Sequence, residues 1–294
     1  MIMPEYENAI VIDNLSKKYD DYVLNKVSFA VPKGSVMGYI GQNGAGKTTT
    51  IRSMMNLIPI DEGEIKILGM DYRKSEMDIK KRIAVVFDEL PVQDIFDAKD
   101  LSYIFEGLYE EWNKVTFKEY LDRFEIPNKR KAGQLSKGMK MKLQIALALS
   151  HNAELLIMDE PTAGLDPVVR DEILHCFMEY VEDGSRSILL SSHITSDLEK
   201  IADCVTYIDR GRILLTGAKD DVIASHLIIR CDKDDIKELD PSDVISARIS
   251  HFGAEVLLHN RGDAHDKYKG MPMDKASLEE IMLYYVNRDK KEWS

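Results

Sequence analysis

The sequence predicts an α/β fold in which helices cover a parallel sheet. Short apolar runs of strand length, such as 34–40 and 155–158, alternate with longer segments of helical period, such as 169–182. The run 34–40 also leads directly into a glycine-rich loop that is followed by a helical segment. This alternation is typical of parallel sheets, whose strands are buried on both faces and joined by helices.

The elements of this fold follow in chain order. β-rich runs occupy 8–13 and 23–31, ahead of the strand at 34–40. Further strands are predicted at 83–87, 155–158, 187–191 and 205–208, with helices at 169–182 and 195–202 between them.

Between 94 and 150 the pattern changes to helical period without strand runs. An apolar stripe there has the spacing i, i+3, i+4 and i+7, and consists of Leu101, Ile104, Phe105 and Leu108. We expect an inserted helical subdomain at 94–150, within a main domain that covers 8–220.

A small α/β accessory domain is expected at 221–294. Its sequence is charge-rich at 231–243, alternates near 244–258 and becomes helical at about 276–287. One face of this last helix should pack against its own domain, and consists of Leu278, Ile281, Met282 and Tyr285.

Composition limits the classes of partner and location. With 51 acidic and 39 basic residues, the formal charge of −12 would repel a phosphate backbone, so no nucleic-acid partner is expected. Cys176, Cys204 and Cys231 lack the spacing of a metal cluster or a disulfide framework, which suits a reducing cytoplasm. We expect neither a signal peptide nor a membrane span, because no apolar stretch approaches about 18 residues.

The glycine-rich loop at 41–48 has the sequence GQNGAGKT, which fits the phosphate-binding pattern G-x-x-x-x-G-K-[ST]. Its glycines can adopt positive φ and let backbone N–H groups surround phosphate oxygens, and the helix that follows adds a partial positive charge. Lys47 should reach the β- and γ-phosphates, and Thr48 should ligate Mg²⁺. This loop predicts a nucleotide-binding protein.

A second motif restricts the class of nucleotide-binding protein. The apolar run 155–158 ends in Asp159 and Glu160, at the edge of the sheet where open α/β folds bind ligands. We expect Asp159 beside Mg²⁺ and Glu160 free to polarise an attacking water.

The third motif is Leu-Ser-Lys-Gly-Met at 135–139, which lies 24 residues before Glu160 when counted from Ser136. It resembles the LSGGQ signature of ATP-binding cassette (ABC) proteins, and Ser136 is a suitable N-cap for the helix that follows. The resemblance covers about 8–220 and implies a P-loop NTPase of ABC type, with an N-terminal antiparallel part and the helical insertion. It also implies that two copies, or two homologous subunits, sandwich two ATP molecules, so that Ser136 contacts ATP held by the partner.

Smaller matches follow in family order. Asp166 resembles the D-loop residue that communicates across the dimer, and His193 resembles the switch histidine that hydrogen-bonds the γ-phosphate. Tyr19 lies where the family stacks an aromatic ring on adenine. The expected nucleotide contacts are therefore Tyr19, Gly41, Asn43, Gly44, Ala45, Gly46, Lys47, Thr48, Thr49, Ser136, Gly138 and Asp166.

Two positions depart from the family pattern. Asp88 replaces the usual Q-loop glutamine and is expected to ligate Mg²⁺ together with Thr48 and Asp159. Lys137 and Met139 replace Gly and Gln in the signature, where backbone contacts to phosphate survive such changes. These variants and the C-terminal run 277–286 look similar to the Firmicutes ABC-2-type exporter branch that includes the phenol-soluble-modulin exporter ATPases.

The resemblance implies an ATPase subunit at the cytoplasmic face of the membrane, which powers export by a separate permease. Glu160 would be the general base, and Lys47 and His193 would be catalytic with it. The cargo could be amphipathic or antimicrobial peptides. Two alternatives stay open: a soluble ABC ATPase that acts on nucleic acid or ribosomes, and a regulatory module that senses ATP without turnover. The single cassette and the charge of −12 disfavour the first alternative, and Glu160 disfavours the second.

Overall fold

A computed structural model describes residues 8–288 and divides the chain into two compact units, one ending at Ile213 and the other beginning at Leu214. The sequence placed this division at 220. None of the helices within 8–288 combines the length and the apolar character needed to cross a bilayer.

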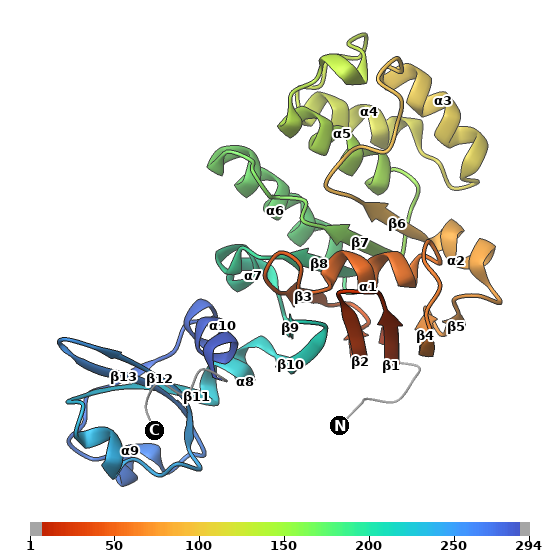
Figure 1. The fold of residues 1–294 in the computed structure, drawn as a ribbon. Coiled ribbons are helices and arrows are strands. Elements are labelled where there is room, and N and C mark those ends of the chain that lie inside the picture. The colour runs from red at the N-terminus through yellow and green to blue at the C-terminus, as the bar shows by residue number, and fades with distance from the viewer. Residues whose placement is uncertain (1–7, 289–294) are drawn as a thin grey trace. The chain divides into compact units, whose positions relative to one another are not determined.

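The first unit is built around a six-stranded sheet (Figure 1). Its strands are β3 (Val36–Ile40), β6 (Ile83–Val86), β7 (Leu155–Asp159), β8 (Ser187–Ser192), β9 (Cys204–Asp209) and β10 (Arg212–Ala218), the strand in which the first unit ends. They follow the order β10-β9-β3-β8-β7-β6, and every neighbouring pair from β9 to β6 is parallel. Strands β3, β7 and β8 are buried along their whole length, as strands covered on both faces must be. The predicted parallel core is confirmed.

An antiparallel sheet forms the N-terminal part of this unit. It consists of β1 (Asn8–Lys18), β2 (Val23–Pro32), β4 (Glu62–Ile67) and β5 (Met70–Asp71), in the order β2-β1-β4-β5. Side chains from both sheets share one hydrophobic core, in which Ile10, Tyr39 and Leu155 are fully buried. This arrangement confirms the predicted antiparallel part and fixes the phosphate loop to a rigid base.

Four helices follow strands or loops of the first unit: α1 (Lys47–Met54), α2 (Glu76–Arg82), α6 (Pro167–Val181) and α7 (Thr195–Ile201). The chain passes from β3 to α1, from β7 to α6 and from β8 to α7. Because β3, β8 and β7 are parallel neighbours, the three connecting loops leave the same edge of the sheet. This topology brings the loops of Lys47, Glu160 and His193 together.

The segment 94–150 contains helices and no strand, and Figure 1 shows these helices grouped beyond the edge strand β6. They are α3 (Ala98–Leu108), α4 (Lys114–Arg123), the 3₁₀ turn η2 (Ala132–Gln134) and α5 (Lys137–Leu149). Asp97 and Asn113 cap α3 and α4 through backbone N–H groups of the first turn. The predicted apolar stripe on α3 is only partly buried, because Leu101 is 1% exposed whereas Leu108 is 64% exposed.

The second unit contains a four-stranded antiparallel sheet of order β12-β13-β11-β14. Its elements are α8 (Lys219–Ala224), β11 (His226–Cys231), the 3₁₀ turn η3 (Asp235–Glu238), β12 (Val244–Ser250), β13 (Gly253–His259), α9 (Ala264–Lys267), β14 (Met273–Lys275) and α10 (Leu278–Asn287). A capping box between Ser277 and Glu280 starts α10. The predicted packing face of α10 is confirmed, since all four of its side chains are buried.

Strands β4, β5, β10, β11 and β14 were not expected from the sequence. β4 (EGEIKI) has only two apolar residues, and β14 has three residues in all. β11 (HLIIRC) is a short apolar run that resembles many non-strand segments. Long-range pairing stabilises these strands: β11 lies between β13 and β14, and Ile229 is fully buried there.

Candidate functional site

The phosphate loop joins β3 to α1 and requires glycine at several positions. Gly44 and Gly46 have φ values of 81° and 119°, which L-residues rarely adopt. A Cβ on Gly46 would lie 2.1 Å from the Tyr22 hydroxyl, and one on Gly41 would lie 2.6 Å from the Ile208 carbonyl oxygen. Side chains at positions 41 and 46 would therefore collide with neighbouring segments, and the positive φ at positions 44 and 46 also favours glycine.

Lys47 is the first residue of α1, and its side chain is 5% exposed. Its ammonium donates to the carbonyl oxygens of Gly41 at 2.6 Å and Gln42 at 3.2 Å. The Nζ atom also lies 3.0 Å from Glu160 Oε1. Lys47 thus has its charge partner at the loop, where a phosphate could compete for it.

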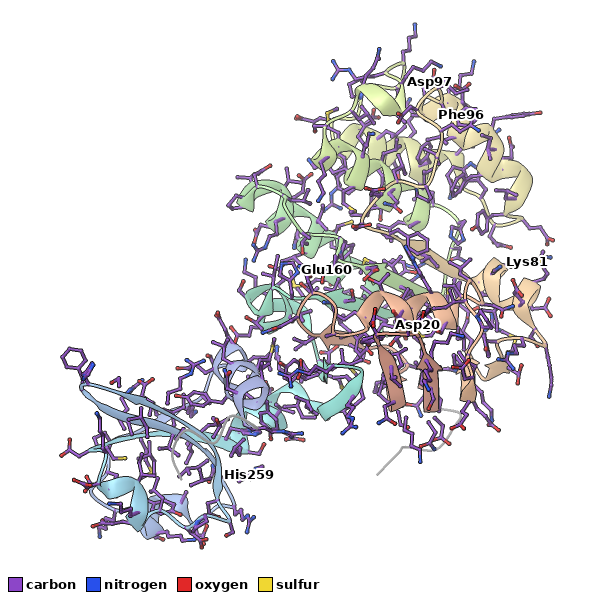
Figure 2. All side chains as sticks on the ribbon, in the orientation of Figure 1. Asp20, Lys81, Phe96, Asp97, Glu160 and His259 are labelled. Carbon is purple, nitrogen blue, oxygen red and sulfur yellow. The ribbon has the colours of Figure 1, made fainter. Side chains whose placement is uncertain are left out.

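Glu160 follows the last residue of β7 and has a left-handed backbone, with φ at 53°. Its N–H donates to the Ser191 carbonyl oxygen at 3.1 Å, which ties the turn to β8. Its Oε2 atom lies 2.8 Å from His193 Nδ1 and 3.4 Å from the His193 backbone nitrogen. Figure 2 shows Glu160 at the edge of the sheet, between the loops of β3, β7 and β8. The carboxylate therefore contacts both predicted catalytic partners.

Asp159 lies at the end of β7, next to Glu160, and is 5% exposed. Its Oδ1 atom accepts a hydrogen bond from the Ser191 hydroxyl at 2.6 Å. Among residues 8–288, no group of three or more His, Cys, Asp or Glu side chains is arranged to hold a metal ion. A cation here would therefore need oxygen ligands from hydroxyls, water or substrate in addition to Asp159.

A cavity of about 400 Å³ opens at the phosphate loop. Its lining consists of Tyr22, Gln42, Asn43, Gly44, Gly46, Lys47, Thr48, Thr49 and Glu160. Thr48 is exposed in the first turn of α1, where the N-cap Gly46 supplies no side-chain hydrogen bond. The structure thus brings together most of the predicted phosphate contacts with Glu160, the predicted general base.

Asp88 lies elsewhere in the first unit. It is exposed and lines a second, polar cavity of about 500 Å³, which also contains Glu89, Asp94, Lys137 and Lys140. Asp88 does not line the cavity that Thr48 lines. Its assignment as a Mg²⁺ ligand stays a prediction.

Ser136 and Asp166 both act as helix N-caps. The Ser136 hydroxyl accepts from Met139 N at 3.3 Å and starts α5, and the Asp166 carboxylate accepts from Val168 N and Val169 N, each at 3.1 Å, and starts α6. Neither residue lines the phosphate-loop cavity, and Gly138, in the first turn of α5, does not line it either. The predicted nucleotide contacts of Ser136, Gly138 and Asp166 therefore stay predictions.

Comparison with known proteins identifies the family. A family model described as "ABC transporter" matches residues 24–163. The ABC transporter ATP-binding protein NatA of Bacillus subtilis (strain 168) is 32% identical over 227 residues, which cover 74% of this chain and 92% of NatA. The chain belongs to the ATP-binding proteins of ABC transporters. Members of this family bind and hydrolyse ATP, so the chain is an ATPase.

Other ABC relatives extend the match. The bacitracin transport ATP-binding protein BcrA of Bacillus licheniformis is 34% identical over 204 residues, which cover 68% of this chain and 67% of BcrA. The Nod factor export ATP-binding protein I of Burkholderia orbicola (strain AU 1054) is 32% identical over 300 residues and covers 95% of this chain and 97% of its own length. A solved structure described as the ATP binding subunit of an ABC transporter has a TM-score of 0.66 at 26% identity, and covers 73% of this chain and 91% of that chain.

Tyr22 lines the cavity at the phosphate loop, which the sequence did not reveal. Its hydroxyl donates to the Ala45 carbonyl oxygen at 2.9 Å, and burial raises the pKa of this hydroxyl to about 12, so it remains a donor. Tyr19, which was expected to stack on adenine, is 42% exposed and does not line the cavity. The Tyr19 N–H donates to the Tyr22 carbonyl oxygen at 2.7 Å, so one turn positions both rings. Nothing in the local pattern distinguishes Tyr22 from an ordinary strand residue.

A buried polar network behind Glu160 also escaped sequence reasoning. The Asp197 carboxylate, which is 1% exposed, accepts from Arg170 Nε at 2.5 Å and from the Thr162 hydroxyl at 2.8 Å. Thr162 is two residues beyond Glu160, and Asp197 lies on α7, which begins two residues beyond His193. The network therefore holds the loops of Glu160 and His193 in a fixed relation.

Proposed function

We propose that this chain hydrolyses ATP with Mg²⁺ in a sandwich of two ATPase subunits and thereby powers export by a separate transmembrane permease. The main support for ATP hydrolysis is the pair of contacts that the Glu160 carboxylate makes, with Lys47 at 3.0 Å and with His193 at 2.8 Å. A module that only sensed ATP would not need a carboxylate in this position.

The contacts of Lys47 suggest how substrate prepares the base. An ATP triphosphate in the loop attracts the ammonium more strongly than one carboxylate does, so Lys47 transfers its charge pairing from Glu160 to phosphate. Glu160 Oε1 is then free to accept a proton from water, while His193 holds Oε2 and fixes the orientation of the carboxylate. Phosphoryl transfer depends mainly on such positioning and on charge stabilisation.

Mg²⁺ would be held by oxygen atoms near the loop. The exposed hydroxyl of Thr48 and the carboxylate of Asp159, acting through water, supply the hard ligands that Mg²⁺ prefers. Bound Mg²⁺ would neutralise charge that develops on the phosphates. Asp88 joins this set only if its loop brings it from the polar cavity to the phosphate loop.

The partner ATPase would supply a second set of contacts to each ATP. Ser136 and Gly138 lie in the first turn of α5, where backbone N–H groups favour an anion. Because they do not line the cavity of their own phosphate loop, we assign them to ATP bound by the second subunit. Asp166 would contribute across the same interface from the start of α6.

An apolar groove of about 300 Å³ offers a surface for the permease. It lies between the helical segment and the β6 region, and its lining includes Leu90, Pro91, Val92, Phe105 and Tyr109. We assign it to an amphipathic cytoplasmic segment of the permease, because the lining is mostly apolar and an apolar helix face would cover it, including Phe105 of the α3 stripe. This contact would hold the chain at the cytoplasmic face of the membrane.

The name of the bacitracin-transport relative supports export of amphipathic or antimicrobial peptides. The formal charge of −12 disfavours the alternative of a soluble ABC ATPase that acts on nucleic acid or ribosomes.

A matched pair of variants tests the permease assignment. Val92 is half-buried in the groove, whereas Ile95 is 66% exposed and does not line it. The tagged full-length chain, purified from detergent-solubilised membranes, should retain a multi-span membrane protein in stoichiometric amount as wild type and as Ile95→Glu. Val92→Glu should lose it while its basal ATPase activity stays intact. Retention of the membrane protein by both variants would refute the assignment of the groove to the permease. Recovery of ribosomal proteins or nucleic acid in place of a membrane protein, with an active ATPase, would refute the transporter assignment.

A further inference from the structure

Gln144 is a polar side chain on the buried face of α5. It is 5% exposed, and its helix neighbours Leu143, Ile145 and Leu147 are buried apolar residues. A buried amide is costly unless its donor and its acceptor are both satisfied. Gln144 must therefore have partners that justify its position.

Both hydrogen bonds of the Gln144 amide go to one residue. Its Oε1 accepts from Phe87 N at 2.9 Å, and its Nε2 donates to the Phe87 carbonyl oxygen at 2.8 Å. The register of β6 with β7 ends at Val86, opposite Met158, so Phe87 lies just beyond the parallel pairing. The Gln144 side chain thus makes the two backbone hydrogen bonds with Phe87 that a neighbouring strand would otherwise make.

The two hydrogen bonds between Gln144 and Phe87, called the clamp below, join two segments that carry predicted site residues. Phe87 directly precedes Asp88, and the signature residue Ser136 is the N-cap of α5. Gln144 also lines both the apolar groove and the polar cavity that contains Asp88. Any displacement of α5 is therefore transmitted to the backbone that carries Asp88, and the reverse also holds.

We propose that Gln144 is a positioning residue that couples the signature helix α5 to the Asp88 loop through the Phe87 backbone. The proposal relies on the ATPase activity of this chain and requires neither the permease nor a particular cargo. Failure of the permease assignment would therefore leave it untouched.

Two substitutions at Gln144 test the clamp. Gln144→Leu has a similar volume but removes both hydrogen bonds, so kcat for ATP should fall about ten-fold while KM changes less than about two-fold. Gln144→Glu can restore both bonds when its carboxyl is protonated, because the acid then has one donor and one acceptor. When ionised, it has no donor for the Phe87 carbonyl oxygen.

The decisive measurement is kcat of each variant relative to wild type between pH 8 and pH 6. Burial raises the pKa of a carboxyl at this position, so the relative kcat of Gln144→Glu should rise as the pH falls, whereas that of Gln144→Leu should stay flat. The ionisable groups that line the two adjoining cavities are Lys80, Tyr109, His151, Asp88, Glu89, Asp94, Lys137 and Lys140. These groups are present in wild type and in both variants. Dividing the kcat of a variant by the kcat of wild type at the same pH therefore removes most of the effect of their titration.

The outcomes are distinguishable. Wild-type kcat in both variants at every pH, or equal pH-independent losses in both, would overturn the proposal. If Gln144→Leu fails to fold, the pH series on a single preparation of Gln144→Glu still tests the proposal. A relative kcat that recovers at low pH cannot come from a general packing defect.

Discussion

Lys47 and Glu160 form an ion pair at the phosphate loop, with Nζ and Oε1 3.0 Å apart. The lysine comes from the start of α1 and the glutamate from the end of β7, more than 100 residues later in the chain. The residue predicted to bind phosphate and the predicted general base are therefore in contact, so a phosphate that attracts Lys47 would change the surroundings of Glu160.

Glu160→Gln should bind ATP but hydrolyse it about 100-fold or more slowly, because the amide cannot accept the proton of the attacking water. The trapped ATP should also hold two subunits together. Steady-state turnover and size-exclusion chromatography with ATP and Mg²⁺ measure both effects, with exposed Glu182→Gln as the control. A monomeric elution profile for Glu160→Gln in ATP would contradict the sandwich.

His193→Ala should lower kcat by about 100-fold with little change in ATP affinity. The reason is that His193 Nδ1 orients the Glu160 carboxylate and does not line the cavity at the phosphate loop. Fluorescent nucleotide titration and turnover separate the two quantities. The exposed His251→Ala variant in the second unit should match wild type in both. An ATP affinity that falls in parallel with kcat would assign His193 to ground-state binding instead.

Tyr22→Phe should weaken ATP binding about five-fold, since loss of one hydrogen bond of about 1 kcal/mol loosens the loop at Ala45. Tyr19→Ala should also weaken binding if its ring stacks on adenine, and Tyr19→Trp should then restore it. Isothermal titration with ATP and with inorganic triphosphate distinguishes the two tyrosines. Only the Tyr22 effect should persist when the base is absent.

Arg170→Ala should destabilise the first unit by about 3–5 kcal/mol, because it leaves the buried Asp197 carboxylate without its cationic partner. Urea unfolding followed by the fluorescence of Trp112, in a Trp293→Phe background, reports on this unit. The control is Lys200→Ala, whose partner Asp171 is exposed and whose loss should cost less than about 1 kcal/mol. Equal losses in the two variants would mean that the network contributes no special stability.

Acidification should destabilise the first unit through His151. Burial lowers the pKa of this imidazole to about 4, and the ring stacks on Tyr109 with centroids 4.0 Å apart. Because the folded state binds the proton less tightly than the unfolded state, stability is complete above about pH 6.5 and falls by about 3 kcal/mol as the pH approaches 4. His151→Phe keeps an aromatic ring but does not titrate, so its unfolding free energy should fall less over this interval. The exposed His175→Gln variant should follow wild type.

The sequence was most informative where function depends on neighbours in the chain. The loop at 41–48 and the strand ending at Asp159 have local patterns with direct chemical meaning, and both lie at the predicted edge of the sheet. Tyr22, Gln144 and the pair of Arg170 with Asp197 act through contacts between distant segments, which a single sequence does not encode locally. Strand β4 was missed for the same reason, since pairing with β1 rather than its own apolar content stabilises it.

The left-handed backbone of Glu160 has a consequence for protein engineering. A φ of 53° costs a residue with a Cβ about 1–2 kcal/mol, and glycine or asparagine at this position would relieve that cost. Libraries selected only for thermostability or expression should therefore enrich replacements of Glu160, and those clones would be better folded but inactive. A selection on this ATPase needs a turnover criterion alongside stability, because at this position the two properties oppose each other.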